Sequence, residues 1–196
     1  MRHVFLDVET QKSFEEVGGY LPQDLKVSFV GICIRDGFSG PGKFQGYFES
    51  DLPKLWPVLE TADVIVGYNI IGFDVETLRP YYSGNPDNWN VLDLLVRFKE
   101  STGHRVKLDA IAQETLGTGK IGDGLKAIEY YKNKQFRELA RYCLYDVAIT
   151  RDVYDYGRKY HQVKYVNKWN RKIEADVDFS FTPPQMGGVQ MTLLGT

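Results

Sequence analysis

Apolar and polar residues follow two different periods along the chain, and these periods predict its elements. Four early runs rich in β-branched and aromatic residues predict strands, at residues 1–10, 26–35, 43–49 and 63–68. The run at 1–10 contains no Gly or Pro and carries apolar residues on both faces, which is typical of a central strand covered on both sides. A Gly/Pro turn separates the second and third runs and predicts a hairpin.

Helical spacing dominates the second half of the chain. The predicted helices lie at residues 52–61, 73–79, 107–116, 125–131 and 135–160. Residues 91–98 predict a fifth strand that turns into a helix, and residues 177–181 could add another strand. Strands that come first, with helices between and after them, predict an α/β domain with a mixed five-stranded sheet flanked by helices.

Composition narrows the class of protein. The 196 residues are 43% apolar, which suits one globular domain with or without a tail. The formal net charge of -2 provides no general basic surface for nucleic acid. Bound divalent cations would nevertheless reverse the sign of an acidic pocket, so charge alone does not exclude such a partner.

The two cysteines and the apolar runs bear on the compartment. Cys33 and Cys143 lack CxxC neighbours and are predicted to be buried free thiols of a reducing compartment. Asp7 and Glu9 would break the apolar stretch of any signal peptide. No apolar run reaches the roughly 18 residues that a membrane span needs. We therefore expect a soluble, cytoplasmic protein with no membrane partner.

Two carboxylates stand near the end of the first predicted strand. Asp7 and Glu9 are two residues apart, so in a strand they point to the same face, about 7 Å apart along the chain. Two buried acids repel each other and lose their hydration, and a cation between them would offset both costs. In the alternative interpretation the strand ends at Asp7 and both acids are solvated in the following loop.

Two further carboxylates occupy positions at which sites form. Asp74 follows a strand and a loop at a helix start, where open α/β sheets place their ligands, although it could instead cap that helix. Asp146 shares an otherwise apolar face of the last long helix with Tyr142. A carboxylate on such a face needs a metal or a cation, and Arg141 or Arg151 could be that cation.

The four acids together predict a metal site. No His or Cys cluster accompanies them, and a set of oxygen ligands selects Mg²⁺ or Mn²⁺ over zinc. Two such ions about 4 Å apart suit in-line attack on a phosphodiester, because they activate the attacking water and stabilise the charge on the phosphate and the leaving 3′-oxygen.

Three segments resemble, in order and spacing, the exonuclease motifs of the DnaQ-like (DEDD) 3′–5′ exonucleases. They are FLDVET at residues 5–10, GYNIIGFD at 67–74 and YCLYDVAITRD at 142–152. The second is similar to the corresponding motif in the proofreading domain of family B DNA polymerases, and residues 93–117 resemble the segment that follows it there. The resemblance covers residues 4–156 and implies a ribonuclease H-like fold.

The resemblance also implies the roles of individual residues. Four acids would bind two Mg²⁺ or Mn²⁺ ions: Asp7, Glu9, Asp74 and Asp146. Tyr142 matches the tyrosine variant of the third motif (DEDDy), and Arg141 stands where the histidine variant needs its base. A tyrosine hydroxyl, whose ordinary pKa is near 10, would orient the attacking water and leave its activation mainly to the metal.

Candidate substrate contacts adjoin the acids. Thr10, Asn69 and Phe73 could hold the last nucleotides of a single strand, and their alternative is to be ordinary loop and core residues. The basic run at residues 164–172, together with the pair at 105 and 107, could bind phosphates. The alternative for each basic residue is a solvated surface.

The end of the chain changes character. We predict an exonuclease domain over residues 1–162, a basic extension over 163–182, and a linker with a C-terminal peptide over 183–196. The peptide from Gln190 to Leu194 resembles the bacterial sliding-clamp-binding pentapeptide, so a sliding clamp could be a partner. The alternative is an apolar tail that packs on the domain.

We expect a stand-alone 3′–5′ exonuclease that releases nucleoside monophosphates from single-stranded DNA ends in repair or replication. The loop at 18–21 and the segment 117–131 differ from the polymerase domains and resemble stand-alone or helicase-associated members of the superfamily. Two alternatives stay open. One is a ribonuclease that processes RNA 3′ ends, and the other is a non-catalytic nucleic-acid-binding module with a vestigial site.

Overall fold

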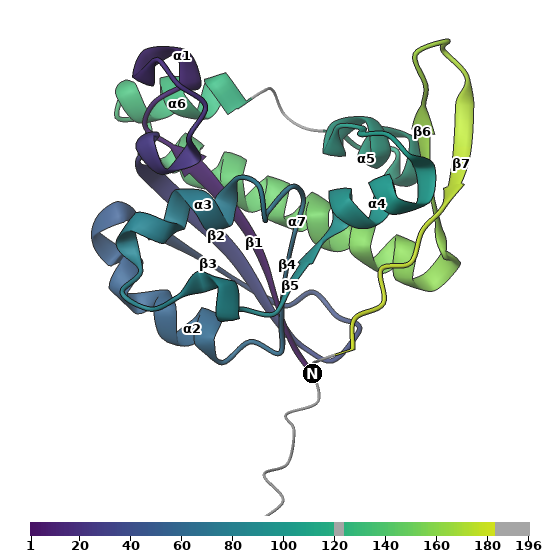
Figure 1. Ribbon diagram of the computed structural model, residues 1–196, viewed down its shortest axis with the longest axis horizontal. Helices are drawn as coiled ribbons and strands as arrows, with labels where there is room; N and C mark the ends of the chain where they lie inside the picture. The colour runs from purple at the N-terminus through teal and green to yellow at the C-terminus, as the bar shows by residue number, and fades with distance from the viewer. Residues whose placement is uncertain (120–123, 183–196) are drawn as a thin grey trace, which may run out of the picture.

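A mixed five-stranded sheet lies at the centre of the molecule (Figure 1). The computed structural model describes residues 1–119 and 124–182. In the order β3-β2-β1-β4-β5, the strands are Lys43–Phe48, Val27–Asp36, Arg2–Thr10, Val64–Gly67 and Val91–Asp93. β2 is antiparallel to both β1 and β3, whereas β4 is parallel to β1 and β5 is parallel to β4. The predicted mixed sheet is confirmed, with the first strand in the middle.

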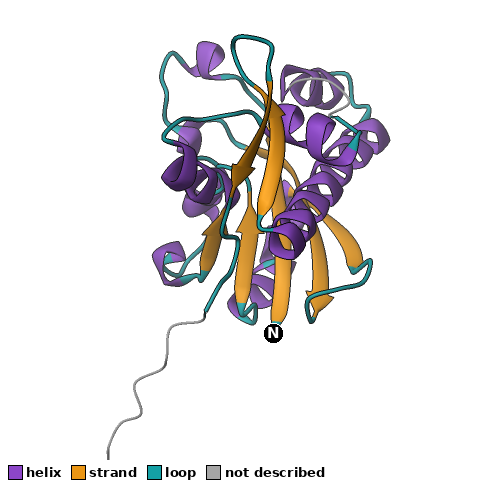
Figure 2. Cartoon of the chain, turned by 90° about the vertical axis from the view of Figure 1, so that its right-hand side faces the viewer, coloured by secondary structure: helices purple, strands orange, loops and turns teal. Residues whose placement is uncertain are grey.

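Helices cover both faces of this sheet (Figures 1 and 2). The α-helices of the described residues are Phe14–Val17 (α1), Trp56–Glu60 (α2), Asp74–Leu78 (α3), Leu94–Thr102 (α4), Leu108–Leu116 (α5), Gly124–Lys132 (α6) and Phe136–Tyr160 (α7). The helix predicted at residues 52–61 begins later than expected and follows a 3₁₀ segment, Glu49–Lys54. Inside the longer helix Pro57 would have broken the hydrogen-bond pattern, whereas it is tolerated in the first turn of α2. Within residues 1–119 and 124–182, no helix is long and apolar enough to span a bilayer.

The side chains of β1 alternate between two hydrophobic cores. Phe5 belongs to the core that contains residues of α4, α5 and α7. Val4, Leu6 and Val8 belong to the other core, with residues of α2 and α3. Because both faces of β1 are covered, a charged side chain on this strand is partly withdrawn from water.

Gly31 of β2 allows α7 to approach the sheet closely. A Cβ atom at this position would lie 2.9 Å from Cys143 Sγ and 3.1 Å from Val147 Cγ2. Such distances are shorter than side-chain packing allows, so any larger residue would push α7 outward.

Replacing Gly31 by alanine is therefore expected to lower the free energy of unfolding by about 1 to 2 kcal/mol, because the added methyl group overpacks this contact. Urea unfolding measures the change. Gly19→Ala is the matched control, because a Cβ at Gly19 meets nothing within 4 Å. If both variants were as stable as the wild type, the close packing of α7 on β2 would be wrong.

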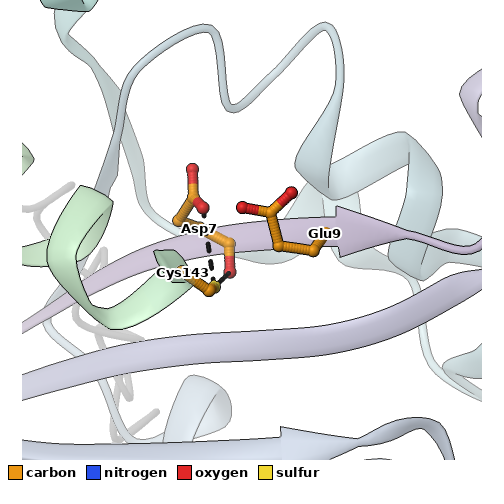
Figure 3. Close-up of side chains that lie close together, drawn as sticks. All are labelled: Asp7, Glu9 and Cys143. Carbon is orange, nitrogen blue, oxygen red and sulfur yellow. Dashed lines mark hydrogen bonds between the residues drawn. The ribbon is translucent and has the colours of Figure 1, made fainter. Parts of the chain in front are cut away.

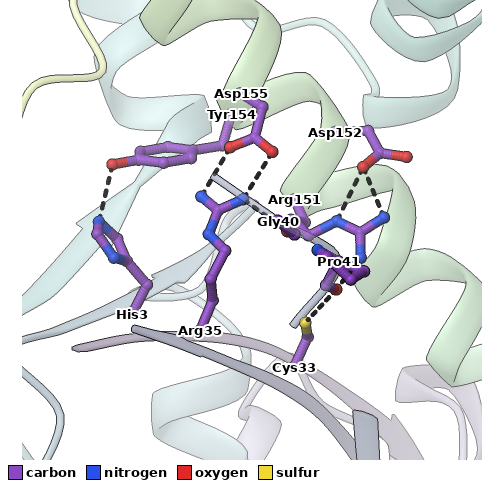
Figure 4. A network of polar contacts seen from close by, with 9 residues as sticks. All are labelled: His3, Cys33, Arg35, Gly40, Pro41, Arg151, Asp152, Tyr154 and Asp155. Carbon is purple, nitrogen blue, oxygen red and sulfur yellow. Dashed lines mark hydrogen bonds and ion pairs between the residues drawn. The ribbon is translucent and has the colours of Figure 1, made fainter. Parts of the chain in front are cut away.

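A buried polar network fixes α7 at a second point (Figure 4). Arg35 of β2 donates from both terminal nitrogens to the carboxylate of Asp155, with both distances 2.7 Å. On the neighbouring strand, His3 is fully buried and its Nε2 lies 3.1 Å from the Tyr154 hydroxyl. The helix is thus held in both rotation and register against the sheet.

His3 makes the stability of the fold depend on pH. Burial lowers its pKa below the ordinary 6.5, and the positive charges of Arg35, the N-terminus and Arg158 lower it further, against a smaller opposing effect of Asp155. Below pH 6.5 the unfolded chain therefore binds a proton that the folded chain resists, so the free energy of unfolding falls as the pH falls through this window.

We expect His3→Gln to reduce this pH dependence, as measured by urea unfolding at about pH 7.5 and about pH 5.5. His161→Asn is the control, because it removes an exposed histidine whose backbone φ of 55° asparagine tolerates. If the free energy of unfolding of His3→Gln depended on pH as strongly as that of the wild type, other groups would cause this dependence.

A β-hairpin follows α7 and packs on the same core as α4 and α5. Its strands are Gln162–Val166 (β6) and Lys172–Asp176 (β7), which pair antiparallel. The additional strand predicted at 177–181 is wrong, because the chain leaves the hairpin after β7 and buries Val177 and Phe179 instead. The domain boundaries predicted at residues 162 and 182 stay a prediction, and residues 183–196, with the clamp-like peptide, lie outside the described residues.

Candidate active site

The second half of β1 carries the first two acids. Oxygen atoms of Asp7 and Glu9 and the sulfur of Cys143 lie within 4.8 Å of one another (Figure 3). Glu9 is buried and Asp7 is half-buried, so neither is the solvated loop residue of the alternative interpretation. Strand geometry places both carboxylates on one face, as predicted.

Asp74 joins this pair from the start of α3. Its Oδ1 accepts a hydrogen bond from the backbone N of Val8 at 2.8 Å, which places the carboxylate beside β1. Burial and then the negative charge of Asp7 hold the pKa of Asp74 well above its usual range. Asp74 therefore does not act as the cap of α3, whose N-cap residue is Phe73.

Asp146 lies in the middle of α7, three residues after Cys143, whose thiol is close to Asp7. It is fully buried, and Arg151, one of the two cations considered as its partner, pairs with Asp152. Burial raises the pKa of the Cys143 thiol, and the negative charges of three acids raise it further: Asp7, Glu9 and Asp146. The carboxylates on β1 and the carboxylate on α7 thus all affect the pKa of the Cys143 thiol.

The donor set of this group fits a hard divalent cation. Four carboxylates from β1, α3 and α7 supply oxygen atoms, and the raised pKa keeps Cys143 a thiol, which donates weakly to Asp7 Oδ2 at 3.5 Å. Oxygen ligands favour Mg²⁺ or Mn²⁺, and a cation would offset both the burial and the negative charge of Asp7 that raise the pKa of Asp74.

Tyr142 lies one helical turn before Asp146 on α7. It is buried and packs edge-on against Tyr130 of α6, with ring centroids 6.4 Å apart. Tyr142 belongs to a small hydrophobic cluster with Phe29, Ala127, Leu139 and Cys143. Its catalytic role stays a prediction.

The three predicted substrate contacts line one hollow with the acids. This hollow, of about 370 Å³, is bordered by Asp7, Glu9 and Asp74 and also by Thr10, Asn69 and Phe73. Phe73 packs edge-on against Phe14 of α1, and Leu125 and Ile128 of α6 form the opposite wall. The structure thus brings these residues together, although their contact with a substrate stays a prediction.

The sequence interpretation gave Asp93 no role near the acids, and it considered Arg105 only as a phosphate contact. Asp93 accepts hydrogen bonds from the backbone N of Asn69 at 2.9 Å and of Ile71 at 3.2 Å, and it also caps α4. Arg105 donates to Asn69 Oδ1 at 2.6 Å. An Asp directly before a helical Leu-Leu pair is a capping signal, but nothing local to Arg105 indicates its partner.

Comparison with known proteins places the fold. The chain is 30% identical over 129 residues to the DNA polymerase alpha catalytic subunit of Trypanosoma brucei brucei. The aligned segment covers 61% of this chain and 9% of that protein. The family B DNA polymerase of Pyrobaculum calidifontis matches 81% of the chain at 18% identity with a TM-score of 0.57, over 24% of its own length. The zinc-bound complex of E. coli exonuclease I with single-stranded DNA matches 81% at 14% identity with a TM-score of 0.53, over 40% of its length.

The chain spans less than half of each of these proteins, and at these identities the structural matches show the fold. They confirm the ribonuclease H-like fold implied by the three motifs. A family model described as RNase_H superfamily matches residues 4–157, which is most of the chain. The chain therefore belongs to the RNase H superfamily.

Proposed function

We propose that this protein is a metal-dependent 3′–5′ exonuclease of the DEDDy type that acts on single-stranded DNA ends. One observation carries the proposal: Asp7, Glu9 and Asp74 line one hollow at the carboxyl end of β1, and α7, which carries the buried Asp146, packs against the same strand. The similar structures include E. coli exonuclease I bound to single-stranded DNA, which supports DNA as the substrate.

Each residue has a proposed task. The four acids hold two divalent cations: Asp7, Glu9, Asp74 and Asp146. When bound, these ions would lower the pKa of an attacking water and offset the charge that builds on the phosphate. The Tyr142 hydroxyl orients that water, while Thr10, Asn69 and Phe73 hold the terminal nucleotides in the hollow beside the acids.

The experiment compares 5′-labelled single-stranded DNA, duplex DNA and RNA of one sequence, with Mg²⁺, with Mn²⁺ and with EDTA. We expect the single-stranded DNA to shorten stepwise from its 3′ end with release of mononucleotides, and EDTA to stop the reaction. Release of the 5′ label first would contradict the polarity. Faster digestion of RNA would favour 3′-end processing of RNA instead.

We propose that the protein acts in the cytoplasm in DNA repair or replication, and that Gln190–Leu194 reaches a sliding clamp. Deleting residues 190–196 should abolish capture by a purified clamp and leave nuclease activity on free DNA unchanged. Equal capture of both forms would refute the clamp interaction.

A further inference from the structure

The hollow beside the acids continues along the molecule toward the β6–β7 hairpin. A second hollow shares Asp7, Tyr68 and Asn69 with the first and adds Arg105 and Lys107. A third hollow, of about 540 Å³, shares Arg105 and Val106 with the second and is lined mostly by hairpin residues such as Tyr165 and Trp169. The three hollows thus follow one another from the acids to the hairpin, and we call this row of hollows the groove.

The hairpin presents Trp169 from a well-defined turn. The Asn167 side chain accepts from the backbone N of Trp169 at 3.0 Å and of Arg171 at 3.1 Å. Thr115 of α5 anchors the stem, with its hydroxyl within 3.0 Å of both the N and the O of Lys164. Trp169 is 69% exposed, so this ordered turn holds a large aromatic ring in water. Figure 1 shows the hairpin standing beside α5.

Positive charge is distributed unevenly on the hairpin and the adjoining loop. On the stem, Lys164 pairs with Glu174 at 3.0 Å and Lys172 pairs with Glu114 at 2.9 Å. At the tip, Lys168 lies over the Trp169 ring, 4.5 Å from its centroid. The stem cations are therefore neutralised, whereas Lys168 lines the groove together with Arg105.

Alternating cations and an exposed aromatic ring suit one class of ligand. Bases stack on an aromatic face without regard to sequence, while Lys and Arg track the phosphates between them. A folded protein partner would instead need a wider apolar surface than one exposed ring.

We propose that this groove holds the single-stranded DNA that leads away from the active site, with a base stacked on Trp169 and phosphates beside Arg105 and Lys168. This inference rests on the proposed function for the position of the 3′ end, and it adds a contact with nucleotides on the 5′ side of that end. The hairpin then sets the affinity for long strands and does not take part in the chemistry.

Intrinsic fluorescence tests the contact without any reaction. Trp169 is the exposed member of the three tryptophans, because Trp56 and Trp89 are partly buried. Adding a deoxythymidine oligonucleotide of about 20 residues in EDTA should quench the wild-type emission, and Trp169→Ala should lose the quenching. No quenching of the wild type at any oligonucleotide concentration would overturn the proposal, whether or not the protein is a nuclease.

Kinetics separate this contact from catalysis. Trp169→Ala should raise KM about tenfold for the long oligonucleotide but leave the hydrolysis rate of thymidine 5′-(p-nitrophenyl phosphate), which cannot reach the hairpin, within about twofold. The matched control is Lys159→Ala with Tyr160→Ala, an exposed cation–ring pair on α7 with a separation of 4.9 Å. It should change neither value.

Three further results would overturn the proposal. The first is an unchanged KM in Trp169→Ala. The second is stronger quenching by an RNA of the same length, which would reassign the strand. The third is a Trp169-dependent dimer in sedimentation that DNA does not disrupt, which would assign the groove to a second copy of the chain. A wild type that binds the oligonucleotide but hydrolyses neither substrate would refute the proposed function and leave the groove intact.

Discussion

Replacing Asp146 by asparagine will lower the rate of nucleotide release by about a thousandfold or more, because a neutral amide cannot replace a carboxylate that holds the divalent cation. Asp146 is fully buried, so the substitution removes a buried negative charge and keeps the shape of the side chain. The metal-free variant should therefore unfold at the same temperature as the wild type or a higher one. Single-turnover digestion of labelled DNA and thermal unfolding in EDTA measure the two effects.

Asp152→Asn is the matched control on the same helix. Asp152 is about half-exposed and pairs with Arg151, away from the acids, so its loss should cost about 0.5 kcal/mol and leave the rate unchanged. If Asp146→Asn kept more than about a tenth of the wild-type rate, the assignment of Asp146 to the metal site would fail.

Replacing Asp93 by alanine will destabilise the protein by about 3 kcal/mol. The Asp93 carboxylate accepts hydrogen bonds from the backbone N of four residues, and alanine offers these donors no acceptor: Asn69, Ile71, Leu95 and Val96. Two of these donors belong to the loop between β4 and α3, so the position of Asp74 should loosen as well. Urea unfolding measures the stability, and the nuclease rate should fall while the rest of the fold is retained.

Asp93→Asn separates the capping of α4 from the ordering of the loop between β4 and α3. One oxygen of Asp93 accepts from three of the four donors, so asparagine should recover most of the capping of α4 while placing an NH₂ group against Ile71 N. We expect its stability to lie between those of the wild type and of Asp93→Ala. Equal stability of all three proteins would show that Asp93 does not order this loop.

The sequence predicts those parts of the site that depend on local geometry. Asp7 and Glu9 fall on one face of β1 because the strand repeats every two residues. The approach of Asp74 to β1 depends instead on a loop in which Asn69 adopts a left-handed φ of 63° and bonds to distant Asp93. The grouping of Asp74 and Asp146 with the first pair came from their positions, after a strand and on a helix, and from the resemblance of three ordered motifs.

The sequence of the β6–β7 hairpin contains the apolar alternation of two strands, but its many lysines directed attention to its charge. Val163 and Tyr165 alternate with polar residues in β6, and Ile173 and Ala175 do so in β7, which is the two-residue period of a half-buried strand. The sequence interpretation emphasised the lysines and saw a basic extension. Salt bridges between these lysines and acids of β7 and α5 explain why the stem packs on the core as ordinary sheet.

In the proposed enzyme, acids from β1, α3 and α7 form one divalent-cation site. Anomalous diffraction from crystals soaked in Mn²⁺ can locate the ions. We expect anomalous peaks between the carboxylates of Asp7, Asp74 and Asp146, and their loss in Asp146→Asn. Manganese bound elsewhere, or full occupancy of the same position in Asp146→Asn, would contradict the assignment of this site.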